Sequence, residues 1–122
     1  MNSTREGGAA QIVNATPHPL ILVDEAGQPW LTIAPSFGPV RLLEDISEPE
    51  TLMHEGKAVP VADVSYGGPT PTLPEPQEGI VYFVSMLTAM RLCDRDDIVF
   101  PLNVKRDDDG NIIGCLSLGR FT

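Results

Sequence analysis

Proline and glycine interrupt this chain so often that little room is left for long helices. The 122 residues include 12 prolines and 11 glycines. Proline lacks a backbone N–H and clashes with the preceding helical turn, and both residue types favour turns. The apolar segments between them are short and rich in β-branched residues, as is typical of strands. We therefore expect an α+β fold, a small and mostly antiparallel β-sheet domain with one short helix.

The clearest strand patterns come from the apolar segments. Residues 20–23 and 30–33 flank the turn residues 24–27, which predicts a hairpin. Residues 80–84, IVYFV, are apolar at every position, so we expect a central strand with both faces buried. Weaker strand patterns cover residues 40–43, 59–66 and 98–100, and Pro60 favours an edge position for the second of these.

The remaining segments are predicted to be less regular. Residues 85–91, SMLTAMR, are the only good helical stretch, and Ser85 can cap its start. The acidic residues 44–55 are expected to form a solvated loop or a turn of helix. Residues 67–79 contain four prolines and predict an extended connector. We expect residues 1–10 to be a flexible tail and residues 11–122 to form a single domain.

The densest charge cluster, RDDDGNIIG at residues 106–114, has the look of a calcium loop. A calcium loop of the EF type alternates its ligands and ends in a glutamate six residues after its glycine. Here the aspartates are consecutive, and Leu116 stands six residues after Gly110. Asp-Gly between two β-rich segments is instead a hairpin signature. The sequence thus favours a turn over a metal site.

Charge and hydropathy exclude several classes of partner. The formal net charge is −9, and the eight Lys and Arg are scattered, so nucleic-acid binding is not expected. No apolar run is long enough to cross a bilayer, and the N-terminus lacks the apolar stretch of a signal peptide. We expect a cytoplasmic protein. Its two cysteines, Cys93 and Cys115, are predicted to be reduced, buried and apolar in character.

The sequence offers no clear catalytic constellation. The serines do not stand in a GxSxG elbow, and neither a GxxxxGK[ST] nor a GxGxxG phosphate loop is present. His18, between two prolines, is predicted to have a structural role in a turn. We therefore predict that the protein is not an enzyme and carries neither a cofactor nor a metal.

Four residues are candidates for binding a ligand. Arg41 interrupts an apolar segment and Arg120 stands between Gly119 and Phe121, and an arginine among apolar residues must find an anion or lie at an edge. Tyr66, beside two glycines, is the aromatic residue expected to be exposed enough to stack on a ring. Asn103 can offer polar contacts, although it can equally fix a turn.

The order of several short motifs resembles a known family. The motifs are VNATPHP (13–19), an Asp-Gly hairpin, IAPS (33–36), LPEP (73–76), YFVS (82–85), RDD (95–97) and RD through G to IIG (106–114). Together they resemble the phage Thoeris anti-defence sponge family, the first described of that type. The resemblance covers most of residues 12–121 and leaves out residues 44–59.

This resemblance implies a function and a site. Members of the family are α+β homodimers or larger oligomers that bind and sequester cyclic ADP-ribose signals made by bacterial TIR-domain proteins, without cleaving them. Their pockets use arginines on phosphates, an aromatic ring on a base and polar contacts to ribose. By position, Arg41, Asn103 and Arg120 would be the polar contacts and Tyr66 the stacking ring.

Two other functions remain open from the residues themselves. The aspartates at 94–97 and 107–109 motivate a metal-dependent hydrolase of a nucleotide signal. A structural or adaptor phage protein, contacting other proteins through free β-strand edges, is the other alternative.

Overall fold

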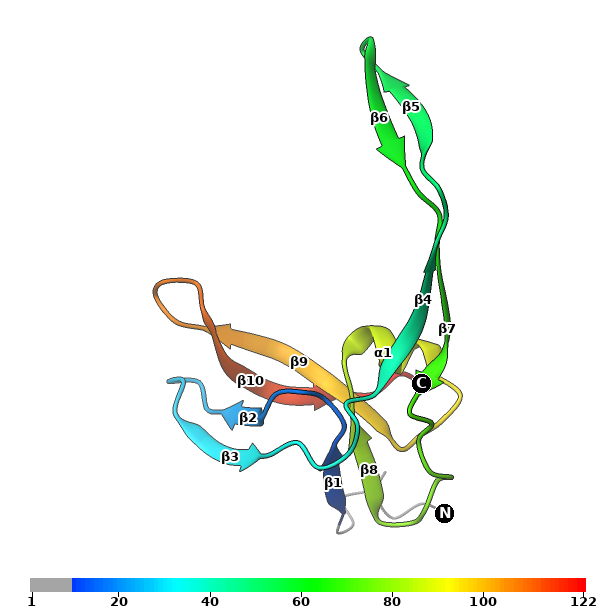
Figure 1. Ribbon diagram of the computed structural model, residues 1–122. Coiled ribbons are helices and arrows are strands. Elements are labelled where there is room, and N and C mark those ends of the chain that lie inside the picture. The colour runs from blue at the N-terminus through cyan, green and yellow to red at the C-terminus, as the bar shows by residue number, and fades with distance from the viewer. Residues whose placement is uncertain (1–9) are drawn as a thin grey trace.

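The computed structural model describes residues 10–122, and it has an α+β fold dominated by strands (Figure 1). All but one residue of the expected flexible tail, 1–10, lie outside this range. The elements in chain order are β1 (Gln11–Asn14), β2 (Leu20–Val23), β3 (Pro29–Ile33), β4 (Arg41–Ile46), β5 (Glu50–His54), β6 (Lys57–Val61), β7 (Val64–Thr70), β8 (Ile80–Phe83), α1 (Met86–Arg91), β9 (Ile98–Arg106) and β10 (Ile112–Gly119).

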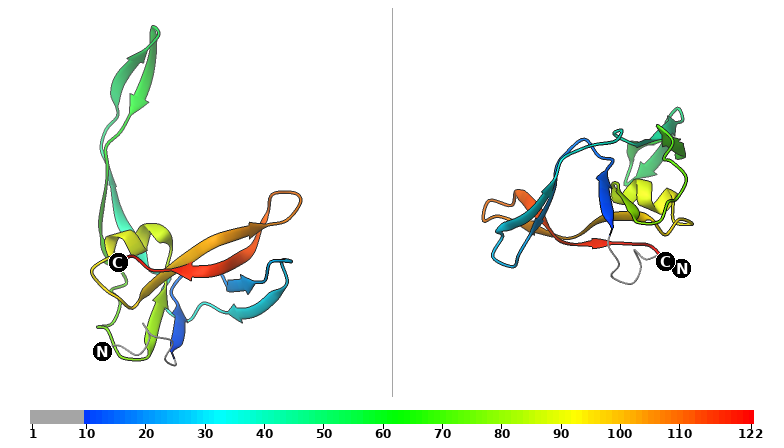
Figure 2. Two further views of the ribbon diagram at one scale, coloured as in Figure 1. Left: turned by 180° about the vertical axis from the view of Figure 1, so that it is seen from behind. Right: turned by 90° about the horizontal axis from the view of Figure 1, so that it is seen from below.

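Two parts of the chain differ in shape, and we name them the body and the arm. The body contains a six-stranded sheet in the order β1-β8-β9-β10-β2-β3, together with α1. The arm, Arg41–Thr70, comprises two short antiparallel ladders, β4-β7 and then β5-β6 at its tip. Figures 1 and 2 show the arm projecting away from the body. Antiparallel pairs outnumber parallel ones, which confirms the predicted fold class.

The core of the body lies on both faces of β8 and β9. Tyr82 and Val84 belong to one buried cluster with Val40, Ala89 and Phe100. The alternate residues Val81, Phe83 and Val99 belong to a second buried cluster, to which β2 contributes Leu20 and Leu22 and β10 contributes Cys115. Because successive side chains of a strand point to opposite faces, this alternation confirms that β8 is a central strand buried on both sides.

Local capping explains where several elements begin and turn. Ser85 caps α1 as predicted, and its hydroxyl accepts a hydrogen bond from the Thr88 N–H. The predicted β2-β3 hairpin is confirmed, and its turn is closed by the Asp24 carboxylate, which accepts from the N–H groups of Ala26 and Gln28.

A buried ion pair ties the proline connector to the sheet. Arg95 donates from Nε and Nη2 to the two carboxylate oxygens of Asp97 at 2.9 and 2.6 Å, and Nη2 also reaches the Pro74 carbonyl at 2.8 Å. Asp97 is fully buried. The hydrogen bonds with Asp97 raise the pKa of the Arg95 guanidinium above its ordinary value, although burial of Arg95 opposes this shift.

The arm is where the sequence-based expectations are wrong. Residues 44–55 form the second half of β4 and all of β5 instead of a loop or helical turn. Residues 59–66 are not one strand, because the chain breaks between β6 and β7, and β7 runs on into the predicted connector as far as Thr70. Acidic composition and prolines favour irregular structure, but cross-strand pairing along the arm overrides those preferences.

No helix among the described residues is long and apolar enough to span a membrane.

Candidate functional site

The loop between β1 and β2 is held by one buried side chain, Asn14. Its Nδ2 donates to the carbonyls of His18 and Ile33 at 2.8 and 2.9 Å. Its Oδ1 accepts from the backbone N–H and the hydroxyl of Thr16 at 3.0 and 2.7 Å. Asn14 is fully buried, and the amide uses both donors and its acceptor. This network fixes Thr16 and Pro17, which line the two cavities described next.

The first cavity lies at the foot of the arm, and we name it the base cavity. It has a volume of about 260 Å³. The arm contributes Arg41, Leu42, Glu44 and Tyr66, the segment before it contributes Val40, the β1-β2 loop contributes Thr16 and Pro17, and the start of α1 contributes Ser85, Leu87 and Thr88. The base cavity thus lies where the arm, the loop and the helix meet.

The base cavity combines a cation, a ring and hydroxyl groups. Arg41 is exposed and Tyr66 is 37% exposed, so both residues are accessible to a ligand. Tyr66 stands directly across the β4-β7 ladder from Glu44, whose carboxylate places a negative charge in the same cavity. The hydroxyls of Ser85 and Thr88 are hydrogen-bonded to each other at 3.1 Å. A guanidinium and an accessible aromatic face are the groups that bind a phosphate and stack on a base.

The structure brings together two of the four residues predicted to bind a ligand. Arg41 and Tyr66 line the base cavity. Asn103 does not line it; it lies exposed on β9 with a positive φ of 56°, and its Nδ2 contacts the Ser117 hydroxyl at 3.2 Å. The roles of these residues toward a ligand stay predictions.

Arg120 is half-buried at the end of β10 and also lies outside the residues that line the base cavity. Its Nε is buried and has no hydrogen-bond partner among the described residues. The next residue, Phe121, stacks on Phe100 with ring centroids 4.5 Å apart and packs against the core cluster that contains Val40. The Arg120 guanidinium therefore retains an unused donor on the body.

Sequence reasoning missed most of the other residues that line the base cavity. Thr16 and Pro17 appeared in a motif without an assigned role, and Ser85 was assigned only as a helix cap. Leu87 and Thr88 carried no pattern of their own. These residues come together only because α1 lies beside the foot of the arm. A contact between segments so far apart in the sequence produces no local sequence pattern.

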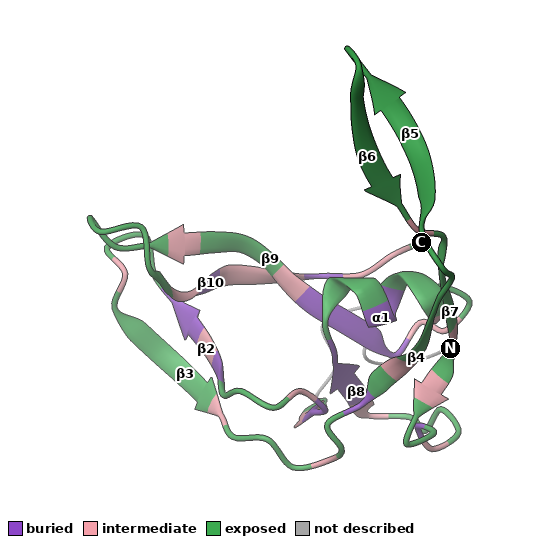
Figure 3. Cartoon of the chain, turned by 45° about the horizontal axis from the view of Figure 1, so that its top comes forward, coloured by how far each residue is buried: buried purple, intermediate pink, exposed green. Residues whose placement is uncertain are grey.

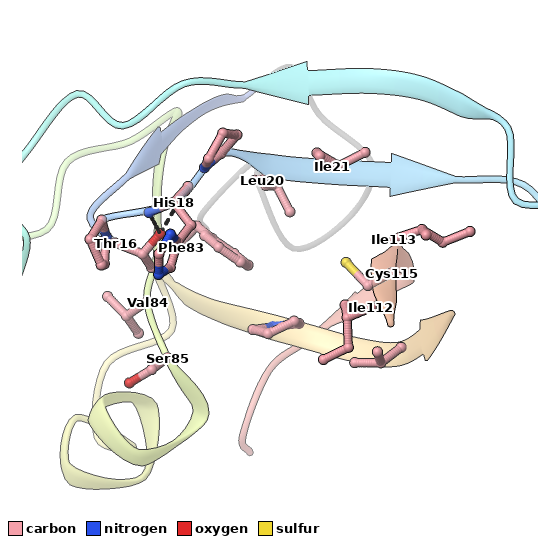
Figure 4. Close-up of a pocket in the computed structure, with 15 residues that line it drawn as sticks. Thr16, His18, Leu20, Ile21, Phe83, Val84, Ser85, Ile112, Ile113 and Cys115 are labelled. Carbon is pink, nitrogen blue, oxygen red and sulfur yellow. Dashed lines mark hydrogen bonds between the residues drawn. The ribbon is translucent and has the colours of Figure 1, made fainter. Parts of the chain in front are cut away.

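The second cavity is an apolar groove of about 550 Å³. Figure 4 shows β2 along one wall, with Leu20 and Ile21, and β10 along the other, with Ile112, Ile113 and Cys115. His18 and Phe83 lie toward one end of the groove. The strands β2 and β10 pair only at Leu22 and Cys115, so the sheet opens beyond that point and leaves the groove between them.

The two cysteines lie in different environments. Cys115 is buried as predicted and lines the apolar groove, and burial raises the pKa of its thiol. Cys93 is exposed, so the prediction that it is buried is wrong. It follows Leu92, the C-cap of α1, in a turn at the surface of the body.

The aspartate-rich segment 107–110 forms the turn of the β9-β10 hairpin, as predicted. The Asp107 carboxylate accepts hydrogen bonds from the N–H groups of Asp109 and Asn111, both at 2.9 Å. These bonds, first those from Asn111, lower the pKa of Asp107. Within residues 10–122, no three His, Cys, Asp or Glu side chains are grouped so that they could hold a metal.

No family model, curated protein or solved structure matches the chain.

Proposed function

We propose that this protein binds and sequesters cyclic ADP-ribose-type signalling nucleotides without cleaving them, and that it thereby blocks bacterial TIR-based defence against phage. The observation that carries the proposal is the base cavity. Arg41 and Tyr66 are 25 positions apart in the sequence, and both line the same cavity. The sequence alone predicts both as ligand contacts, and the resemblance of the motif order to the sponge family points to the same ligand class.

The chemistry of such a ligand matches the groups at the foot of the arm. A cyclic ADP-ribose carries two phosphates, an adenine ring and ribose hydroxyls. Arg41 would bind phosphate oxygens through charge-assisted hydrogen bonds, and the Tyr66 ring would stack on the base. The hydroxyls of Ser85 and Thr88 would contact ribose. A protein that only sequesters its ligand needs affinity and no nucleophile.

The size of the base cavity limits how the ligand sits. Its volume of about 260 Å³ is below the ~300–1,000 Å³ typical of pockets that enclose drug-sized ligands. The ligand would therefore be partly open to solvent, or covered by a second copy of the chain in a homodimer. Glu44 and the net charge of −9 oppose an anion, so Arg41 must supply the locally positive field. We place this activity in the bacterial cytoplasm, where the signals are made.

Calorimetric titration with the isomers of cyclic ADP-ribose tests the proposal. We expect stoichiometric binding of at least one isomer, and Arg41→Ala should weaken it by roughly 10- to 100-fold, the value of a lost charged hydrogen bond. The matched control is Arg91→Ala, because Arg91 is exposed and does not line the base cavity. For the ring, Tyr66→Ala should weaken binding, whereas Trp30→Ala removes an exposed aromatic residue elsewhere and should not.

The same titration tests whether Arg120 and Asn103, the other two predicted contacts, bind the ligand. An unchanged affinity in Arg120→Ala or Asn103→Ala would remove that residue from the site. Failure of the wild-type protein to bind any isomer would overturn the proposed function.

A further inference from the structure

The apolar groove between β2 and β10 is a cavity that the proposed nucleotide site does not use. Its volume of about 550 Å³ lies within the ~300–1,000 Å³ typical of pockets that enclose a small ligand. Neither Arg41 nor Tyr66 lines the groove, and the described residues that line it include no Asp, Glu, Lys or Arg. A nucleotide phosphate would meet no cation there. The groove therefore suits a ligand of a different chemical class.

The walls of the groove are held in place by contacts within the chain. On one side, the Asn14 amide bonds two backbone carbonyls and fixes the β1-β2 loop, which Pro17 and Pro19 restrict further. On the other side, β10 lies so close to β2 that a Cβ added at Gly114 would be 2.6 Å from the Ile21 carbonyl oxygen. A preformed cavity loses little conformational entropy when a ligand binds, which favours affinity.

The two ends of the groove differ in polarity. Figure 4 shows Thr16, His18 and Ser85 toward one end and Ile112 and Ile113 toward the other. A ligand that matches this arrangement has an apolar body and one polar end.

Only one of the three polar side chains is available to a ligand. The Thr16 hydroxyl lies 2.7 Å from Asn14 Oδ1 and 2.9 Å from the His18 carbonyl oxygen, and the Ser85 hydroxyl is bonded to that of Thr88 at 3.1 Å. Within residues 10–122, the hydrogen bonds of His18 all use its backbone. Its imidazole is exposed and offers a donor and an acceptor when neutral.

The charge of the chain disfavours an ionised ligand. The formal net charge of −9 repels anions. A carboxylate seated in the groove would lose water and find no cation, and an ammonium would find no carboxylate. A ligand of the groove is therefore uncharged.

We propose that the groove binds a neutral amphipathic small molecule, with an aliphatic or aromatic body along Ile112 and Ile113 and a hydrogen-bonding head group, such as a hydroxyl, at His18. Burial of the apolar body would supply most of the affinity, and the head group would fix the direction of the ligand. This site does not rest on the proposed nucleotide function, because Arg41 and Tyr66 lie outside the groove lining.

The arm also exposes apolar residues, so the test must separate the two surfaces. Figure 3 shows exposure along most of the arm, whereas the buried residues gather in the body. Ile112 in the groove lining is 60% exposed, and Leu52 at the tip of the arm is 58% exposed. Aspartate at each position gives a matched pair that differs in location. Its short side chain keeps the charge close to the strand.

Fluorescence titration with N-phenylnaphthylamine, an uncharged probe that brightens in apolar surroundings, tests the groove. We expect saturable binding to the wild-type protein. Ile112→Asp should weaken it at least about tenfold, because the carboxylate must be desolvated, and Leu52→Asp should leave it unchanged. If Ile112→Asp lowers the melting temperature, Val104→Asp replaces it, because Val104 is 45% exposed in the same lining. Unchanged binding in the groove variant that keeps its melting temperature, or an equal loss in Leu52→Asp, would overturn the groove as the binding site.

Competition for the bound probe tests the chemical class of the ligand. Octanol should displace the probe at least about tenfold more effectively than octanoate, which carries a charge into the groove. His18→Phe should weaken displacement by octanol about two- to tenfold, the value of one neutral hydrogen bond. The control is His54→Phe, because the His54 side chain is exposed on the arm and does not line the groove.

Three results would contradict the proposed ligand. Equal displacement by octanoate would overturn its neutral class. Unchanged displacement by octanol in His18→Phe would remove His18 as the polar contact. Probe affinity that falls as the protein concentration rises would show that a second copy covers the groove, and would overturn a small molecule as its occupant.

Discussion

The body and the arm are built from similar strands, yet they differ in what covers them. In the body, β8 is apolar at each of its positions and carries buried clusters on both faces. In the arm, β5 and β6 include Leu52, Met53 and Val59, and every residue is exposed. The comparison shows that β-strand preference and cross-strand pairing can shape a hairpin, whereas burial decides whether its side chains add to stability.

The largest loss of stability is expected for a substitution in the buried core of the body. Phe100→Ala removes a ring that is 5% exposed and stacked on Phe121, so it should lower the free energy of unfolding by about 3–5 kcal/mol. Leu52→Ala in the arm should cost less than about 0.5 kcal/mol in dilute protein, because Leu52 is 58% exposed and its apolar neighbour across the ladder is the exposed Val59. Urea denaturation of both variants measures the difference. Equal losses of unfolding free energy in the two variants at low protein concentration would contradict the conclusion that Leu52 packs against no buried core.

A smaller loss of stability is expected when a polar side chain that hydrogen-bonds two chain segments is removed, and the loss should be greater in the body than in the arm. Asn14→Ala in the body leaves the carbonyls of His18 and Ile33 without their buried donor, which should cost about 2–3 kcal/mol. Ser47→Ala in the arm removes an exposed hydroxyl that accepts from the Asp63 N–H at 2.9 Å and should cost under about 1 kcal/mol, since water replaces it. Thermal denaturation checks the ranking, and a costlier Ser47→Ala would reverse it.

The smallest effect concerns pH at the β9-β10 turn. The hydrogen bonds to Asp107 lower its pKa below the ordinary value of 3.8. A carboxylate with a depressed folded-state pKa stabilises the fold above its unfolded-state value, and this contribution is lost as the pH falls through the folded-state pKa. The protection of the Asn111 amide against exchange, relative to its intrinsic exchange rate at each pH, should therefore fall as the pH drops below about 3.8, and Asp107→Asn should abolish that pH dependence.

The control for the turn is Asp108→Asn, because Asp107 is the side chain that accepts the turn N–H groups. An identical pH response in Asp108→Asn and Asp107→Asn would show that general acidity, and not this carboxylate, governs the turn.

The body could be predicted from the sequence because its cues are local. Apolar residues at every position of β8, the Asp24 turn and the Ser85 cap each specify nearby structure, and all three expectations are confirmed. The arm could be predicted only in part, through the weak strand patterns at residues 40–43 and 59–66, because its strands are acidic, contain Pro60 and bury no apolar face of their own. Without a buried face, the sequence pattern does not specify where these strands begin, end and pair.

The candidate site could be predicted only in part. Arg41 and Tyr66 stood out because a charge among apolar residues and a ring beside glycines are visible in one sequence. The contributions of Leu87 and Thr88 depend on the packing of α1 against the foot of the arm, which no local pattern encodes. Asn103 stood out on the same kind of local cue, yet it lies on β9 outside the base cavity.

We propose that the molecule captures a cyclic nucleotide and breaks no bond in it. The most direct measurement incubates the protein with an excess of the tightest-binding cyclic ADP-ribose isomer, removes free ligand, denatures the protein by heat and identifies the released molecule by mass and chromatography. We expect about one equivalent of unchanged ligand per site from the wild-type protein and far less from Arg41→Ala. Conversion of the ligand beyond one equivalent, abolished by a metal chelator, would contradict it and favour a hydrolase.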